Sequence, residues 1–132
     1  MVFTDLTANI DLMKEDNSDY LGDFSDEELT DLKRLAALER LESDLTTALN
    51  FAQKDSDILA DVAENYEDTL NLALTYKQLE LYYFSRINLG GLSQYRLDYY
   101  REEYNMIRKG FRNYSVTVSH NPASASVQGF SA

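Results

Sequence analysis

Apolar residues recur at steps of three and four along three stretches of this chain, the spacing of helices that pack one face against their neighbours. In the first stretch, residues 26–53, the steps run through Leu38, Leu41, Leu45, Ala48 and Ala52. In the third, residues 94–112, they run through Leu97, Tyr100, Tyr104, Ile107 and Phe111. The middle stretch, residues 57–88, is apolar over a wider arc, which predicts a helix buried on more than one side. The pattern predicts an all-α fold, a small bundle of three long helices with residues 57–88 at its centre.

A capping signal marks where the first long helix begins. Ser25 is followed three residues later by Glu28, the spacing of a capping box in which each side chain accepts a hydrogen bond from the other residue's backbone N–H. Phe24 stands just before this cap, where its ring is expected to pack against Leu29. We therefore expect the core helices to begin at residue 25.

The acidic N-terminal segment, residues 1–24, precedes this cap. Its apolar residues are spaced four and three apart and predict a short helix over residues 4–15, capped by Thr4 or Asp5. Residues 16–24 are acidic and contain a glycine, so we expect a loop there.

A pair of glycines separates the second and third predicted helices. Gly90 and Gly91 suit the end of a helix, where glycine adopts conformations that other residues avoid. Ser93 follows at a position suited to an N-cap. These signals predict a helical hairpin that turns at the glycines.

Charge is unevenly placed along the 132 residues, which carry a net charge of −11. Residues 1–70 hold 19 acidic and five basic side chains, a balance of −14, whereas residues 71–132 hold four and seven, a balance of +3. The acidic half would repel phosphates, which argues against specific nucleic-acid or anionic-membrane binding there. Opposite ends of this kind could dock head to side with copies of the chain, although acidic side chains also simply solubilise an exposed helical face.

The chain has no cysteine, so it has neither a disulfide framework nor a thiolate site. Its first residues lack the basic and apolar regions of a signal peptide, and no apolar stretch is long enough to span a membrane. We expect a soluble protein made in the cytoplasm.

Tyrosine is abundant, with ten in the chain, and many lie beside arginines within residues 75–111. Both residue types suit interfaces, because they combine large contact area with directional hydrogen bonds. Adjacent helical positions point about 100° apart, so we expect one member of each pair, Tyr82–Tyr83 and Tyr99–Tyr100, on the surface or at an interface. The candidate contacts with partners or between subunits are Tyr83, Tyr99, Arg101, Arg108, Lys109 and Arg112. Alternatively, these tyrosines rim a small core with their hydroxyls in water.

The final twenty residues, 113–132, contain no Asp, Glu, Lys or Arg. They cannot build a core, and their low charge sets them apart from ordinary disordered segments. The apolar positions that could anchor them on a partner are Tyr114, Val116, Val118, Val127 and Phe130. We predict a helical domain over residues 1–112, with its core helices in 25–112, and an extended C-terminal arm over 113–132 that becomes ordered on a partner by strand addition or pocket filling. A frayed terminus is the simpler alternative.

No catalytic, metal or cofactor site is predicted. His120 is the only histidine, and a lone imidazole without thiolates makes a poor zinc site. The aspartates of residues 16–24 lack the glycine and glutamate offsets of a calcium loop. Glu64 and Asp68 lack the Glu-x-x-His repeats of a di-metal bundle. We therefore expect a protein that is not an enzyme.

Three consecutive features resemble the head–tail connector proteins (adaptor or head completion proteins) of tailed bacteriophages. They are the apolar helix ending LALTYKQLELYYFSR, a short glycine-containing turn, and the basic, aromatic helix YRLDYYREEYNMIRKGF. The resemblance covers residues 26–112 in architecture and the uncharged tail in character. The acidic segment before Ser25 departs from the shortest members of the family.

The resemblance implies a non-enzymatic virion protein at the head–tail interface, present in the host cytoplasm during assembly. It further implies a homo-oligomeric ring, dodecameric in the family, that could surround DNA. The C-terminal arm, through the five apolar positions named above, would bind the portal protein, and a tail-side or stopper protein would bind the other face.

An acidic DNA mimic, such as an anti-restriction or anti-CRISPR inhibitor, is the alternative function. Its acidic helices would imitate the phosphates of a duplex, for which residues 1–70 are suited. Such a mimic usually spreads acidic residues over its whole surface and has little use for an uncharged arm, which disfavours it here. A generic helical regulator stays open as a third possibility.

Overall fold

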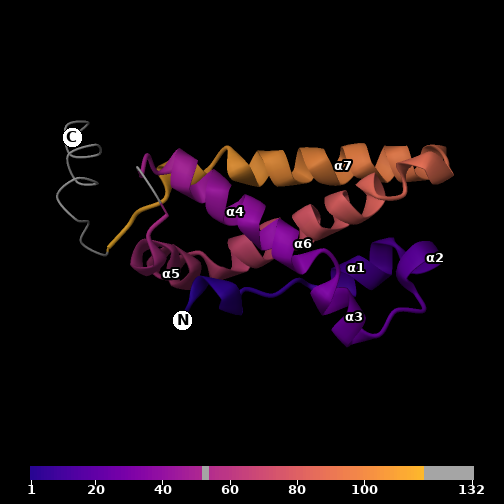
Figure 1. Cartoon of the computed structure of the whole chain (residues 1–132), viewed down its shortest axis with the longest axis horizontal. Helices are drawn as coiled ribbons and strands as arrows, with labels where there is room; N and C mark the ends of the chain where they lie inside the picture. Colours follow the sequence, from indigo (N-terminus) through magenta and orange to yellow (C-terminus); the bar gives the residue numbers. More distant parts are fainter. Residues whose placement is uncertain (52–53, 118–132) are drawn as a thin grey trace.

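The computed structural model describes residues 1–51 and 54–117, without the side chain of Leu89 (Figure 1). Over these residues the protein is all-α, with no strand, which confirms the predicted fold class. Its α-helices are α1 (Ile10–Asp16), α2 (Ser18–Leu21), α3 (Asp26–Asp31), α4 (Arg34–Ala48), α5 (Ser56–Asn65), α6 (Glu67–Phe84) and α7 (Gly91–Arg108). Short 3₁₀ helices, η1 to η3, cover Phe3–Asp5, Ile87–Leu89 and Phe111–Asn113.

The hairpin of α6 and α7 is the frame of the molecule. The two helices run along its long axis and meet at one end, while α4 crosses α6 on one side (Figure 1). Helix α6 is covered on several sides, since even polar residues of its middle turns, such as Thr75 and Gln78, are buried. At the turn, Gly90 has a φ of 138°, a conformation that favours glycine.

Two apolar clusters make up the core. The larger joins α4, α5 and the first half of α6 to the end of α7, and includes Leu41, Leu45, Val62, Leu70 and Tyr104. The smaller joins α1, α2 and α3 to the second half of α6, and includes Met13, Leu21, Leu29, Leu79 and Tyr83. We call residues 1–31, which end with α3, the N-terminal lobe.

The first predicted long helix is broken in two, which corrects the expected span of residues 26–53. The break falls at Lys33, whose φ of 55° places it in the left-handed region between α3 and α4. The Gln78 side chain of α6 compensates for the break, because its Nε2 donates to the backbone carbonyls of Leu32 at 2.7 Å and Thr30 at 3.2 Å. A buried amide thereby satisfies carbonyls that the interrupted helix leaves without partners.

The second predicted helix is also broken, which corrects the span of residues 57–88. Tyr66, with a φ of −127° and a ψ of 33°, separates α5 from α6. Glu67 and Asp68 then lie in the first turn of α6, where acidic side chains stabilise the positive end of the helix dipole. Helix α6 ends at Phe84, ahead of the position expected from the glycines.

Three expectations about shorter elements were also wrong. Residues 4–15 do not form one helix, because η1 is followed by a separate α1 that Asn9 caps by accepting from the Leu12 backbone at 3.1 Å. Part of the expected loop over residues 16–24 is the short helix α2. Ser93 is a buried residue within α7, which begins at Gly91, and so it does not cap that helix.

The capping box at the start of α3 is confirmed. The Glu28 backbone donates to Ser25 Oγ at 3.1 Å, and the Ser25 backbone donates to Glu28 Oε1 at 2.9 Å. These hydrogen bonds hold the pKa of the Glu28 carboxyl below its usual value. Phe24 and Leu29 belong to the same apolar cluster, where Phe24 also meets the Tyr82 ring edge-on.

Candidate functional site

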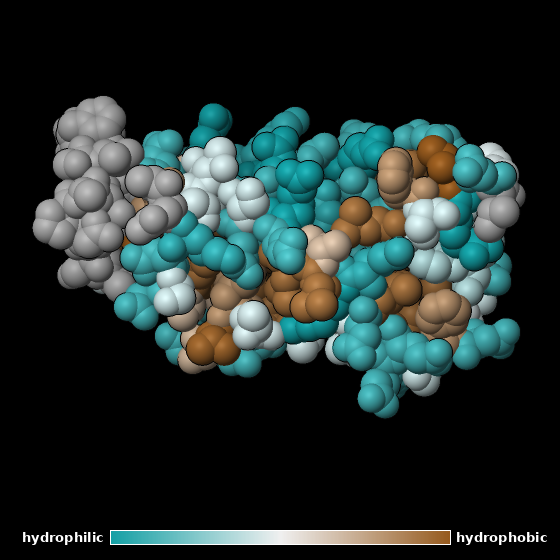
Figure 2. Space-filling model, viewed as in Figure 1, coloured by the Kyte–Doolittle hydropathy of each residue, from teal (hydrophilic) through white to brown (hydrophobic). Residues whose placement is uncertain are grey.

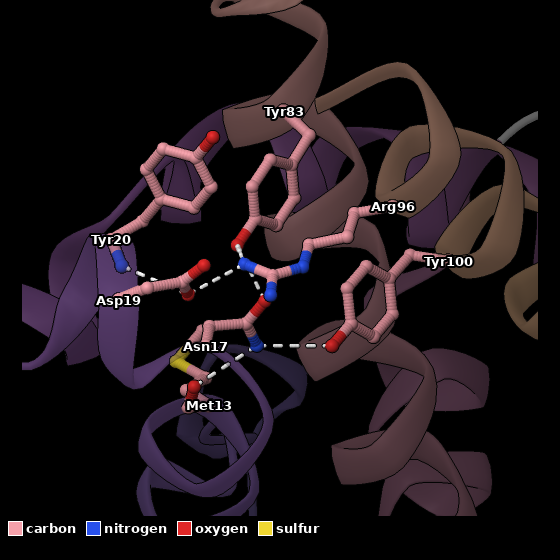
Figure 3. Close-up of polar contacts among 7 residues, drawn as sticks. All are labelled: Met13, Asn17, Asp19, Tyr20, Tyr83, Arg96 and Tyr100. Carbon is pink, nitrogen blue, oxygen red and sulfur yellow. Dashed lines mark hydrogen bonds and ion pairs between the residues drawn. The ribbon is translucent and has the colours of Figure 1, made fainter. Parts of the chain in front are cut away.

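A buried polar cluster joins the N-terminal lobe to the hairpin (Figure 3). Asn17, between α1 and α2, is fully buried, and its Nδ2 donates to Met13 O at 3.0 Å and to Tyr100 Oη at 2.9 Å. The Tyr83 hydroxyl donates to Asn17 Oδ1 from α6. Arg96 of α7 completes the cluster. One amide side chain thus connects the lobe with both helices of the hairpin.

Arg96 links the buried tyrosine to a carboxylate at the surface. Its Nη1 donates to Asp19 Oδ1 at 2.7 Å and to Tyr83 Oη at 3.1 Å (Figure 3). The hydrogen bond from Arg96 holds the pKa of the Asp19 carboxyl below its usual value. Burial raises the pKa of the Tyr83 phenol, and it raises the pKa of Tyr100 to about 12. Both hydroxyls are therefore neutral at physiological pH, and Tyr83 donates to Asn17 while Tyr100 accepts from it.

A second polar cluster joins α6, α7 and α4. Lys77 Nζ and Glu80 Oε1 form a largely buried ion pair at 2.7 Å, and Lys77 Nζ lies 4.1 Å from the centre of the Tyr104 ring. Tyr104 Oη donates to Asp44 Oδ2 at 2.7 Å, and Arg101 approaches Glu80 at 3.5 Å. Burial, followed by the hydrogen bond to Asp44, raises the pKa of the Tyr104 phenol.

Within each cluster the polar groups bond to one another. Such clusters can fix how the helices pack. Among residues 1–51 and 54–117 no group of three His, Cys, Asp or Glu side chains is placed to hold a metal ion. Hollows on this part of the chain are open to solvent, and one is lined by Glu39, Glu42, Thr46 and Lys54, with the last pairing to Glu42 at 2.8 Å. These groups interact through hydrogen bonds and ion pairs.

The outer face of α7 carries most of the residues predicted to contact partners. Tyr99 is 46% exposed, and the four basic side chains are exposed along the second half of the helix and the 3₁₀ turn that follows it. These side chains, which we call the basic face, are Arg101, Arg108, Lys109 and Arg112. The structure therefore leaves these side chains exposed along α7 and the turn after it, with Tyr99 on the side of the helix away from Arg101 and Arg108.

Tyr83 is the exception among these candidates. Its side chain is fully buried and takes part in the cluster around Asn17. Tyr82 is also buried, so the expectation that one of this pair is exposed was wrong, whereas it is right for Tyr99 and Tyr100. Both tyrosines of the first pair are covered because α6 has neighbours on several sides.

An apolar stripe that the sequence interpretation passed over runs along α7. Its members lie three, four and seven residues apart on α7 and are well exposed: Leu92 (46%), Tyr95 (68%), Tyr99 (46%) and Met106 (62%). The spacing that could have revealed it is in the sequence, but the stronger stripe through Leu97, Tyr100 and Tyr104 masks it. In Figure 2 apolar surface is visible near the hairpin end and over the crossing of α4 and α6.

The start of the predicted arm lies against the body. Phe111 is fully buried, and the ring of Tyr114 stacks on that of Tyr66 with centroids 3.8 Å apart and planes 3° from parallel. Ser115 N donates to Tyr66 Oη at 2.8 Å, and Thr117 N donates to Asp61 Oδ2 at 2.8 Å. We call residues 111–117 the C-terminal clasp.

The clasp includes residues 113–117, the first residues of the predicted arm. Tyr114 and Val116 are half-buried against the larger core cluster and form no strand. Val118, Val127 and Phe130 lie outside the described residues. Asp61, Tyr66 and Asn17 were missed as attachment points, because each acts through contacts with residues about 50 or more positions away.

Comparison with known proteins yields no relative. No protein-family model, no curated protein and no solved structure matches the chain. None of the helices in the described part of the chain has the length and apolar character to cross a membrane.

Proposed function

We propose that this protein is a non-enzymatic structural adaptor of a tailed phage. It forms a ring between the portal and the tail-side proteins, and its extended C-terminal arm docks on the portal. Two features support the proposal: a clasp that fixes where the uncharged tail starts, and an outer helix face rich in tyrosine and arginine. The resemblance of residues 26–112 to head–tail connector proteins supplies the class.

The C-terminal clasp is the main observation that supports the proposed docking arm. Tyr114 stacks on Tyr66 and Thr117 bonds to Asp61, so the last described residues are tied to α5 at one end of the molecule (Figure 1). The fifteen residues from 118 to 132 carry no formal charge and start from this tied point. An uncharged segment that starts from a rigid base loses less freedom on binding than one on a loose tether.

The outer face of α7 provides surface for further protein contacts. Tyr95, Tyr99 and Met106 expose apolar and aromatic area, and tyrosine and methionine are enriched at protein interfaces. An exposed apolar and aromatic stripe on a helix that already buries another face is suited to a partner. Portal-side and tail-side contacts can thus use different parts of the molecule.

Truncation after Thr117 tests the proposal. The clasp keeps its stacking and hydrogen bonds in this variant, so the helical body should fold, while binding to the portal protein encoded beside this gene should be lost. A matched control carries Val118→Ala alone, which leaves the rest of the tail in place and should reduce binding only partly. Unchanged binding by the truncated protein, or a gene neighbourhood without portal or capsid genes, would contradict the proposal.

One observation favours a second candidate, the acidic DNA mimic. The N-terminal lobe holds ten acidic and one basic side chain, and most of the carboxylates are exposed. A mimic should inhibit a DNA-binding host defence protein and lose inhibition when lobe carboxylates are neutralised. It should be indifferent to the truncation after Thr117, which separates it from the adaptor.

A further inference from the structure

Two surfaces of opposite charge lie apart on this molecule. The N-terminal lobe carries a balance of −9 over residues 1–31, with exposed carboxylates at Asp23, Glu27 and Asp31. The basic face supplies four positive charges over the second half of α7 and η3, which together with Glu102 and Glu103 leaves a balance of +2 over residues 100–113. In Figure 1 helices α1 to α3 of the lobe lie near the hairpin end, whereas the chain starts beside α5 and the second half of α7 runs toward that opposite end.

Most of these charges have no opposite partner among residues 1–51 and 54–117. Over the described residues, Arg108, Lys109 and Arg112 form no ion pair, and neither do Asp23, Glu27 and Asp31. Lobe and α7 are joined by the ion pair of Asp19 with Arg96, which lies in the first half of α7. Arg101 approaches Glu80 at 3.5 Å, so the other three side chains of the basic face are the ones left for a partner outside this molecule.

Apolar side chains lie among the charges on both surfaces. On α7, Met106 is 62% and Tyr99 46% exposed. On the lobe, Leu12, Tyr20 and Phe24 are only partly buried between acidic positions. Charged surroundings with apolar area inside them are typical of protein interfaces, where charge sets orientation and apolar burial adds affinity.

We propose that the basic face of one copy of this protein docks on the N-terminal lobe of a second copy. The two surfaces differ, so the contact is head-to-tail, and repetition closes a ring or extends a filament according to the rotation between copies. This contact would be the subunit interface of the proposed ring, and in that respect it rests on the proposed function. The charge placement from which it is argued does not depend on a phage origin.

Nucleic-acid phosphates are the competing partner for an arginine cluster. The whole chain carries −11, and the lobe of the same molecule would repel a duplex that approached α7. The N-terminal lobe of a second copy would instead offer carboxylates that can pair with the arginines and lysine of the basic face. The observations therefore favour self-association over binding of nucleic acid.

A reciprocal charge exchange tests this contact in the full-length protein without any portal. One variant, Arg108→Glu/Arg112→Glu, changes the balance over residues 100–113 from +2 to −2. The other, Asp23→Lys/Asp31→Lys, makes part of the lobe basic, and Asp31 is the last residue of α3, where a cation suits the helix dipole. Analytical ultracentrifugation over a range of concentrations and salt gives the association constant, and circular dichroism checks the fold.

The wild type should self-associate, and more weakly as salt rises. Each variant alone should lose at least about tenfold in affinity. An equimolar mixture should recover pairing, because the unaltered lobe of the first variant then meets the unaltered basic face of the second. General damage cannot produce that recovery. If either variant unfolds, the neutral change Arg108→Gln/Arg112→Gln should still weaken association.

Three results would overturn the proposed contact. The wild type could stay monomeric at every concentration, the mixture of variants could fail to recover association, or the basic face could bind duplex DNA while the copies do not associate. The ring could fail in this test while truncation after Thr117 still abolishes portal binding, and the reverse could also occur. The two proposals are thus separable.

Discussion

The two ends of the chain are attached to the same hairpin by different means. The N-terminal lobe is held by a buried cluster around Asn17 and by fully buried apolar residues such as Leu21 and Leu29. The C-terminal clasp has one fully buried anchor, Phe111, followed by a half-exposed tyrosine stack and hydrogen bonds at the surface. The difference teaches that the lobe is part of the folding unit, whereas the clasp beyond Phe111 is an attachment that can be loosened separately.

Alkaline pH should cause the largest loss of stability, because it acts on several buried tyrosines at once. Burial raises the pKa of Tyr83, Tyr100 and Tyr104 in the folded protein, to about 12 for Tyr100. An unfolded tyrosine ionises near pH 10. Their contribution to stability is therefore complete below about pH 10 and is lost as pH rises further, by up to about 1.4 kcal/mol per pH unit for each.

Ultraviolet absorbance of tyrosinate, followed together with circular dichroism, measures this loss. We expect exposed tyrosines to ionise first and the buried ones to ionise as the fold is lost. Ten tyrosines that titrate together near pH 10 in a protein that stays helical would contradict the buried placement.

Asn17→Ala should come next, with a loss of about 2–4 kcal/mol in the free energy of unfolding. The change leaves the buried hydroxyls of Tyr83 and Tyr100 without their amide partner, and an unsatisfied buried polar group costs about 1–3 kcal/mol. Urea unfolding measures the loss. The matched control is Asn65→Ala, at an exposed position where a change below about 0.5 kcal/mol is expected. Equal effects of the two variants would show that the lobe does not depend on Asn17.

Tyr114→Ala should have a smaller effect, about 1–2 kcal/mol, because it removes a stacked ring that is only half-buried. The clasp beyond Phe111 should become sensitive to protease while the N-terminal lobe keeps its protection. Tyr95→Ala, at an exposed position on α7, serves as the control and should leave both regions protected. Loss of protection in the lobe would break the distinction between the two attachments.

Asp19→Asn should have the smallest effect. The hydrogen bond from Arg96 lowers the pKa of Asp19 in the folded state, so the stabilisation is present above the unfolded pKa of about 4 and is lost as pH falls through the lowered folded value. The Asp19 side chain is 47% exposed, which keeps the effect small. Thermal unfolding should separate variant and wild type at neutral pH and bring them together in acid, below the lowered pKa of Asp19. A difference that persists in acid would point to packing in place of charge.

Local signals were sufficient to predict the parts of the fold that local contacts determine. The capping box at Ser25 and the buried stripe of α7 through Leu97, Tyr100 and Tyr104 are where the sequence places them. The exposed basic residues of α7 follow from the same periodicity. These features involve residues only a few positions apart, so spacing alone reveals them.

The breaks at Lys33 and Tyr66 could not be predicted in the same way. Apolar spacing continues through both positions, and the breaks depend on distant side chains: Gln78 bonds to the carbonyls before α4, and Tyr114 stacks on Tyr66. The burial of Tyr83 could have been predicted, because a central helix covered on several sides can bury adjacent residues. Asn17 gave no signal, since an asparagine in an acidic segment is usually solvated.

The hydrogen bond between Asn17 and Tyr100 spans 83 positions of the chain, and this has a consequence for synthesis. At about 5–20 residues per second, the lobe leaves the ribosome roughly 4–16 seconds before the helix that receives it exists. During that interval the apolar side of the lobe has no partner. Its −9 charge then serves the nascent chain, because like charges on neighbouring chains keep unfinished lobes apart until the hairpin closes over them.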